Sequence, residues 1–175
     1  MAWRWTVQET TGRPPSPRAG FASALINETL YVAGGWDGTS AFGDAFAVSI
    51  ETRHWRQLAV RGREGATLEG RILFAHASIG STLFMHGGAE VTNLANLHSD
   101  LLALDTRTST LRVVATGGVP PGPLMRHSMA ARENSLWMFG GFRGRAFSAD
   151  MYRLEFHDIY GDAAANDGMP EAMWR

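Results

Sequence analysis

The sequence predicts an all-β fold built from about three copies of one four-stranded sheet. Three glycine pairs stand 53 residues apart along the chain, at Gly34-Gly35, Gly87-Gly88 and Gly140-Gly141. A short apolar run precedes each pair, and an aspartate opens a second apolar run after it, at Asp44, Asp100 and Asp150. A spacing of this size that is kept three times indicates structural repeats.

Each repeat predicts four short antiparallel strands, the content of one blade of a β-propeller. In the first repeat we expect strands at residues 21–26, 29–34 and 44–50 and a fourth strand around Trp55. The turns between them are predicted at residues 27–28 and 51–53. The second repeat places its turns at residues 80–81 and 106–108.

The predicted strands are apolar on both faces, as in a sheet that lies between two others. In the second strand, Leu30 and Val32 lie on one face and Tyr31 and Ala33 on the other. A sheet with one wet face would alternate apolar and polar residues instead. We expect the aromatic residues at equivalent positions, Tyr31, Phe84 and Trp137, to be core residues. Trp55 is expected to be buried between blades, so that Trp55→Ala would cost about 3–5 kcal/mol.

The first repeat resembles the kelch motif. The run from Leu30 to Gly35, preceded by the segment 17–21 with its Arg18 and followed by Asp44 and Trp55, is similar to that motif, and the resemblance covers roughly residues 3–156. The later repeats depart from the motif at a few places. Leu73 replaces a glycine, Leu111 replaces the tryptophan, and Arg126-His127-Ser128 stands where Arg-x-Gly-His-Ser is expected.

The resemblance implies one kelch-type β-propeller segment over residues 1–175. We expect a partial fourth strand at 3–9, blades at 14–58, 71–115 and 120–156, a loop insertion at 157–173 and the start of the interrupted fourth strand at 174–175. Propellers close with about four to eight blades, so three blades favour a fragment of a larger, six- or seven-bladed propeller. The alternatives are a homodimer with six blades, or closure by Trp5 pairing onto the third blade. An open blade face would also favour self-association.

The composition narrows the classes of function. The net charge is −1, which argues against nucleic acid and against an anionic membrane surface. The chain has no cysteine, so a thiolate metal site, a cysteine nucleophile and the Tyr–Cys copper site of kelch-type oxidases are excluded for these residues. No run approaches the ~18 apolar residues of a membrane span, and the N-terminus does not resemble a signal peptide. We expect a cytoplasmic protein without a cofactor.

The histidines and aspartates predict no catalytic or metal site. A turn at residues 80–81 pairs His76 with Met85 and His86 with Ala75, so the two histidine side chains leave opposite faces of the sheet. One aspartate in every repeat indicates a structural role. His98-Ser99-Asp100 is adjacent in sequence, which catalytic triads rarely are. We therefore expect no enzyme activity from this segment.

The remaining candidate site is the rim. By resemblance, the loops after the glycine pairs and the arginines before the first strands lie on the usual contact face of kelch propellers. The candidate partner-binding residues are Arg18, Trp36, Asp37, Arg71, Glu90, Arg126, Phe142, Arg143 and Arg145. Arginines and aromatics suit an acidic or phosphorylated peptide. Alternatively, the arginines bond neighbouring carbonyl groups, and Trp36 and Phe142 pack across the loop bases.

The leading functional hypothesis is a scaffold that binds a partner protein or peptide through its rim loops. A second hypothesis is the accessory propeller of a larger enzyme or ubiquitin-ligase adaptor, with the working domain outside this chain. A third is a sugar- or metal-dependent enzyme that acts in the central channel. The fold alone cannot choose among them, because function depends on individual sites.

Overall fold

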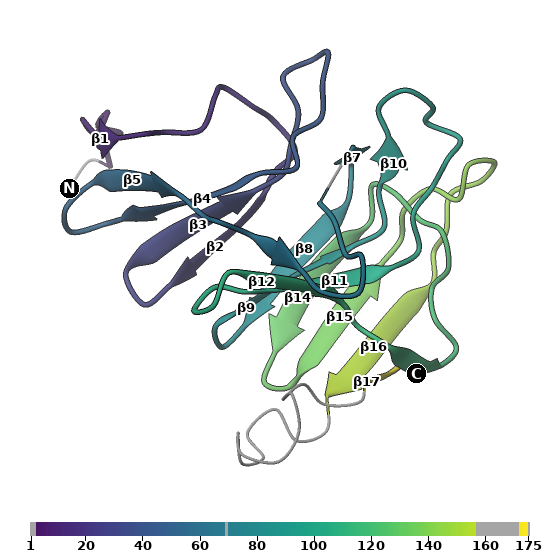
Figure 1. Ribbon diagram of the computed structural model, residues 1–175. Helices are drawn as coiled ribbons and strands as arrows, with labels where there is room; N and C mark the ends of the chain where they lie inside the picture. Colours follow the sequence, from purple (N-terminus) through teal and green to yellow (C-terminus); the bar gives the residue numbers. More distant parts are fainter. Residues whose placement is uncertain (1–2, 69, 157–171, 175) are drawn as a thin grey trace.

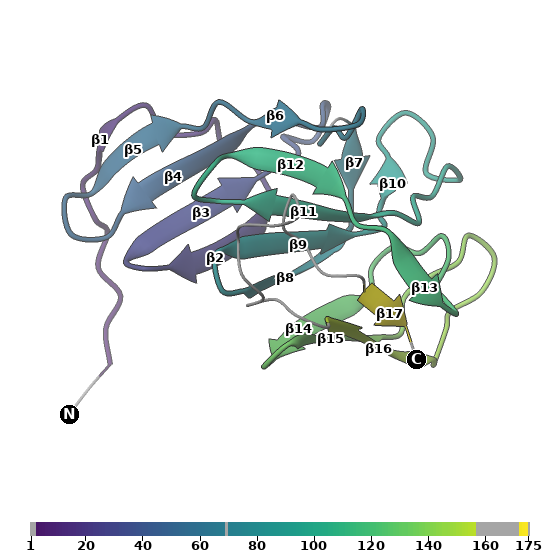
Figure 2. The ribbon, with the colours of Figure 1, turned by 60° about the horizontal axis from the view of Figure 1, so that its bottom comes forward.

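Three antiparallel sheets follow one another along the chain and lie side by side (Figures 1 and 2). The computed structural model describes residues 3–68, 70–156 and 172–174. The predicted all-β, blade-by-blade fold is confirmed, and blade 2 lies between blades 1 and 3. Among the described residues there is no helix of the length and apolarity needed to cross a membrane.

Blade 1 is formed by four antiparallel strands in sequence order. They are β2 (Ala22–Ile26), β3 (Thr29–Ala33), β4 (Ala45–Ser49) and β5 (His54–Gln57). The short strand β1 (Thr11–Gly12) adds to the outer edge in parallel with β5. The expected turn at residues 27–28 is present, with positive φ at both Asn27 and Glu28.

Blades 2 and 3 repeat this plan. Blade 2 contains β8 (Ala75–Ile79), β9 (Thr82–His86), β11 (Leu101–Asp105) and β12 (Thr110–Val113), with β6 (Arg61–Gly62) parallel at its edge. Blade 3 contains β14 (Ser128–Arg132), β15 (Ser135–Phe139), β16 (Met151–Phe156) and β17 (Ala172–Trp174), with β13 (Thr116–Gly118) at its edge. A small separate sheet joins β7 (Arg71–Ile72) to β10 (Ala89–Glu90). The register of β8 and β9 pairs His76 with Met85 and His86 with Ala75, as predicted.

The first strands of the three blades are neighbours: β8 contacts β2 on one side and β14 on the other. Their small side chains explain this closeness, because Ala22, Ala24, Ala75 and Ala77 let the backbones approach. Figure 2 shows the sheets fanning outward from these inner strands.

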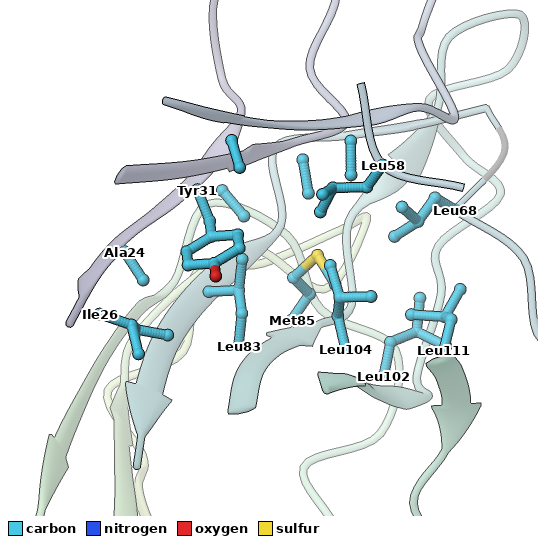
Figure 3. Packing of buried hydrophobic residues seen from close by; sticks show 14 of the residues in the cluster. Ala24, Ile26, Tyr31, Leu58, Leu68, Leu83, Met85, Leu102, Leu104 and Leu111 are labelled. Carbon is cyan, nitrogen blue, oxygen red and sulfur yellow. The ribbon is translucent and has the colours of Figure 1, made fainter. Parts of the chain in front are cut away.

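Two hydrophobic clusters join the blades. The cluster between blades 1 and 2 places small residues and Tyr31 of blade 1 against large aliphatic residues of blade 2 (Figure 3). Blade 2 contributes Leu83, Met85, Leu102, Leu104 and Leu111. The cluster between blades 2 and 3 includes Phe84, Leu101 and Leu124, which pack with Leu136, Met138, Leu154 and Phe156. Each fully buried leucine of this kind stabilises the fold by about 1.5–3 kcal/mol.

At each of the two joints between blades, a ring of the later blade lies against the first glycine of the pair in the blade before it. A Cβ atom on Gly34 would meet the Phe74 ring of the next blade at 3.4 Å, and one on Gly87 would meet the backbone of Leu124 and, at 3.2 Å, the His127 ring. Phe74 and His127 each immediately precede the first-strand region of their blade. Blades 2 and 3 therefore each place one ring against the glycine of the preceding blade.

Two aromatic residues that we expected in the core are half-exposed instead. Trp55 lies on the face of blade 1 that has no blade beside it, whereas Leu111, at the equivalent place in blade 2, is 1% exposed. Trp137 lies on the outer face of blade 3, with the Arg153 guanidinium 5.2 Å from its ring centroid. Tyr31 and Phe84 are buried as predicted. The difference follows from which faces have a neighbouring blade.

The chain ends differ from the expected boundaries. Residues 3–9 form no strand, and Trp5 is fully exposed, so it does not pair onto the third blade here. A fourth strand needs the third strand of its own sheet, and the described residues offer none at this end. The last strand begins at Ala172, two residues before the expected start, and pairs with β16 as the fourth strand of blade 3. The remainder of the expected insertion, residues 157–171, lies outside the described residues. Self-association stays a prediction.

Truncating Leu111 should destabilise the chain more than truncating Trp55. Leu111→Ala should cost about 2–5 kcal/mol, because it opens a cavity in the buried cluster between blades 1 and 2. Trp55→Ala should cost less, since solvent already reaches that side chain. Urea denaturation of both variants measures the difference. A larger loss for Trp55→Ala would show that its face is covered.

Candidate interaction surface on the rim

The three loops that follow the glycine pairs lie at one end of the blades, the upper end in Figure 1. At the base of each loop, the residue after the glycine pair bridges two backbone segments. Trp36 pairs with Ala19 and Ala41, and Phe142 pairs with Met125 and Phe147. Ala89 takes the same place in blade 2, where it pairs with Ile72 and Leu97.

Trp36 and Phe142 are consequently parts of the loop bases. Both are half-buried, and the Phe142 ring lies 5.2 Å from the Phe147 ring. Of the two alternatives considered for these residues, the geometry favours packing across the loop. Phe147 pairs with Phe142 at the base of its loop but is 84% exposed, and Leu94, in the blade 2 loop, is 47% exposed.

Arg18 points into the protein and joins two parts of blade 1. Its guanidinium donates to Asp44 at 2.6 and 3.3 Å and to the Gly34 carbonyl at 2.9 Å. It also stacks over the Phe42 ring, 4.0 Å from the ring centroid. The side chain is 3% exposed. Arg18 therefore holds the glycine turn and the start of β4 together and is not offered to a partner.

Arg71 repeats this arrangement in blade 2. It donates to Asp100 at 2.8 and 3.0 Å and to the Gly87 carbonyl at 3.4 Å, and its side chain is 6% exposed. Burial alone would raise the pKa of Asp100, but the hydrogen bond and the charge of Arg71 outweigh it and hold that pKa below its usual value. The recurring aspartate is thus the partner of the recurring arginine.

Blade 3 makes the same contact with an arginine from another place in the sequence. Leu124 occupies the position of Arg18 and Arg71, and Arg143, from the loop after the glycine pair, reaches Asp150 at 2.9 Å. Arg143 also donates to the Pro121 carbonyl at 2.6 Å. The hydrogen bond to Asp150 is the main factor that raises the pKa of Arg143.

The sequence analysis grouped Arg126 with Arg18 and Arg71. In the structure it occupies a different position. It stands at the place of Gly20 and Leu73, and all three have positive φ, at 57°, 62° and 62° respectively. Arg126 is exposed. The missing arginine of the third repeat therefore shifted the alignment by two residues.

The other predicted rim residues divide into structural and exposed groups. Asp37 accepts from the backbone N–H groups of Ser40 and Thr39 at 2.8 and 2.9 Å, and these bonds lower its pKa to about 2. It shapes its own loop. Arg145 is exposed and lies in the loop of blade 3. Glu90 is half-buried and accepts from the Asn96 amide at 3.1 Å.

Two grooves lie between neighbouring loops, and Glu90 and His98 line both. The groove between blades 2 and 3 has a volume of about 430 Å3, and its walls include Asn96, Pro123 and Arg143. The groove between blades 1 and 2 has a volume of about 500 Å3, and its walls include residues 39–41 and 91–92. Burial, and next the charge of Arg71, lower the pKa of His98. At neutral pH, the His98 side chain that lines both grooves is therefore chiefly a neutral ring.

The sequence analysis missed His98 and Pro123 as groove residues. His98 was considered only as part of an apparent hydrolytic set, and Pro123 carries no motif. Both come from segments whose length and conformation differ among the repeats, so the 53-residue spacing carried no signal for them. Within the described residues, no group of three or more histidine, cysteine, aspartate or glutamate side chains is arranged to hold a metal ion.

Comparison with known proteins agrees with the blade geometry. A family model described as the KLHDC2/KLHL20/DRC7 Kelch-repeats domain matches residues 1–98, more than half of the chain. The chain belongs to the kelch-repeat family. The matched residues include the glycine pairs of blades 1 and 2 and both members of the Arg18–Asp44 contact.

The relatives of this kelch segment differ in kind. Kelch domain-containing protein 10 of Homo sapiens is 27% identical over 155 residues, which are 86% of this chain and 35% of that protein. Multiple epidermal growth factor-like domains protein 8 of Homo sapiens is 31% identical over 169 residues, 89% of this chain and 6% of that protein. N-(sulfonatooxy)prop-2-enimidothioate sulfolyase of Thlaspi arvense is 26% identical over 162 residues, 90% of this chain and 45% of that protein. The chain thus spans about a third of the first of these relatives.

The buried arginine–aspartate contact predicts unequal effects of one substitution at two equivalent sites. Asp100→Asn should destabilise by about 1.5–3 kcal/mol, because it removes a charged hydrogen-bond partner of the buried Arg71. Asp150→Asn should cost less, since Asp150 is exposed and solvent can compensate for the lost charge. Thermal denaturation at neutral pH compares the two variants. Equal losses would mean that burial does not strengthen the contact.

Proposed function

We propose that this kelch segment is a protein-interaction module that binds a partner protein or peptide along the rim, in the grooves that meet at Glu90 and His98. The observation that carries the proposal is the arrangement of these two grooves. They adjoin each other across three successive loops, so an extended peptide could contact all three blades at once. Kelch-repeat membership supports an interaction role of this general kind.

The chemistry of the rim suggests what the partner carries. Arg18, Arg71 and Arg143 contact aspartates of their own blades, so the exposed Arg126 and Arg145 are the cations we assign to an acidic or phosphorylated peptide. Exposed apolar side chains in the rim loops, Phe147 at 84% and Leu94 at 47%, are the apolar anchors we assign to this surface. We assign no nucleic acid and no membrane to this surface, in keeping with the net charge of −1, and we place the protein in the cytoplasm.

A second candidate is a role within an enzyme. The sulfolyase of Thlaspi arvense matches 90% of this chain, and that favours testing for lyase activity in the protein to which these blades belong. An accessory propeller of an enzyme or of a ubiquitin-ligase adaptor would use the same rim to hold a substrate. The two candidates differ in whether a bound molecule is released chemically changed.

Selection from a displayed peptide library, followed by binding measurements on purified variants, tests the rim proposal. The double variant Arg126→Glu/Arg145→Glu should bind the selected peptides at least tenfold more weakly than the wild type, because it reverses two charges on the rim. Glu28→Arg, in the β2–β3 turn at the opposite end of blade 1, is the control and should leave affinity unchanged. Affinity for the wild type should fall as salt is raised.

Two outcomes would contradict the proposal. Peptides that bind the rim variant as tightly as the wild type would place the contact elsewhere on the chain. Turnover of added N-(sulfonatooxy)prop-2-enimidothioate, followed by mass spectrometry, would favour the enzyme candidate.

A further inference from the structure

Two buried histidines meet where blades 2 and 3 join. His86 ends β9 and is 1% exposed, and His127 precedes β14 and is 7% exposed. His86 Nδ1 lies 3.1 Å from His127 Nε2, and the rings meet edge to face with centroids 5.1 Å apart. The distance is that of a hydrogen bond, so one ring donates its N–H and the other accepts.

The neighbouring joint has no histidine at either place. In blade 1, Ala33 stands where His86 stands, and Phe74 is the ring seated on Gly34. His127 takes the place of Phe74 and would lie 3.2 Å from a Cβ on Gly87. A phenyl ring therefore suffices for this contact between blades, and the histidine pair adds a polar, titratable contact to a position that does not require one.

The groups around the pair do not offset two added positive charges. Asp100 favours the protonated form of His86, as does a hydrogen bond with the Ser99 backbone, whereas Arg71 opposes it. Asp100 is itself engaged by Arg71 through two hydrogen bonds. A positive charge on His86 disfavours protonation of His127 and so lowers the pKa of His127. One added proton can be shared between the rings, but two would bring two N–H groups and two positive charges together.

We propose that the His86–His127 contact is an acid-sensitive latch: it closes the joint between blades 2 and 3 when both rings are neutral and opens that joint when they are protonated. The latch also regulates the groove above it. Gly88 donates to the Leu124 carbonyl at 2.9 Å, and Leu124 donates to the His98 carbonyl at 3.2 Å, so the segment that carries Pro123 is held close to the His98 wall. Opening the latch frees this segment and widens the groove. Only this last effect, on binding, rests on the proposed function.

The direction of the pH dependence follows from the pKa values. Burial lowers the pKa of His86 from 6.5 to about 4, and burial together with His86 lowers that of His127 to about 3. Both groups therefore bind protons more weakly when folded than when unfolded. The latch is fully effective above pH 6.5, weakens as the pH falls below that value, and is lost as the pH approaches 4 to 3.

The first experiment measures the latch without any partner. NMR titration of the histidine ring protons, assigned with His86→Ala and His127→Phe, should find two rings that remain neutral at pH 5.5. Amide exchange at Gly88 and Leu124, corrected for intrinsic rates, should accelerate between pH 6.5 and 5. Amides of blade 1 such as Trp36, which donates to the Ala19 carbonyl, should keep their protection.

The second experiment replaces the latch with the residues of the other joint. His86→Ala/His127→Phe introduces the residue types that Ala33 and Phe74 supply at the joint between blades 1 and 2, so the variant should fold. Between pH 7 and 5 the folding equilibrium constant of the wild type should lose a factor on the order of 500 that the variant does not lose. His54→Ala, which removes an exposed histidine, is the matched control and should keep the wild-type pH dependence.

The outcomes separate the latch from the rim proposal. Both rings titrating near pH 6.5, or an unchanged pH dependence in the double variant, would overturn the latch whatever the chain binds. If the latch titrates as stated and the peptides selected on the rim bind equally at pH 7 and 4, its regulation of the groove is wrong. If no peptide binds the rim at either pH, the proposed function is wrong. The latch is then judged by the NMR titration and by the pH dependence of stability alone.

Discussion

The contact on which the rest of the structure depends is the seating of one ring on a glycine at each joint between blades. Gly34 receives Phe74, whose ring would lie 3.4 Å from a Cβ on that glycine. Gly87 receives His127, where a Cβ would overlap the Leu124 carbonyl oxygen and lie 3.2 Å from the ring. With the rings seated, the inner strands β2, β8 and β14 lie against one another, and two hydrophobic clusters close between the sheets. Blade packing and the orientation of the rim loops thus follow from the same short contact, because each seated ring lies within a few residues of a rim segment.

The arginine–aspartate contacts explain why the rim keeps its shape. Arg18 and Arg71 each join the glycine turn to the start of the third strand, and in blade 3 Arg143 makes the contact from the opposite side of the loop. A contact that arises from two different places in the sequence indicates that the blade needs the interaction itself. Arg18 and Arg71 are consequently unavailable to a partner, whereas Arg143 is 34% exposed and also lines a groove. In the function we propose, recognition depends on residues that differ among the loops, which are the groove residues Glu90 and His98 and the exposed Arg126 and Arg145.

The sequence predicted features that depend on local spacing and left open those that depend on neighbouring blades. The strands and turns of blades 1 and 2, the opposite orientation of His76 and His86, and the kelch-type fold all follow from side-chain periodicity and turn residues. Trp55 was predicted to be buried because the motif places it between blades, but burial requires a second sheet and Trp55 faces none. Arg126 was aligned with Arg18 because the third repeat lacks an arginine at that position. The contact between His86 and His127 joins residues 41 positions apart in two blades, and no repeat pattern indicates it.

Gly87→Ala compared with Gly140→Ala is the most direct test of the ring-on-glycine account. The two glycines have similar backbone conformations, with φ of +67° and +73°, so both variants bear the cost of a left-handed alanine, about 1–2 kcal/mol. A Cβ on Gly87 would overlap the Leu124 carbonyl oxygen of the next blade and lie 3.2 Å from the His127 ring, whereas one on Gly140 would meet only the Ser148 carbonyl, at 3.6 Å. We predict that Gly87→Ala loses about 1–3 kcal/mol more unfolding free energy in urea than Gly140→Ala. Equal losses would contradict the account, because the glycines would then be needed for their backbone conformation alone.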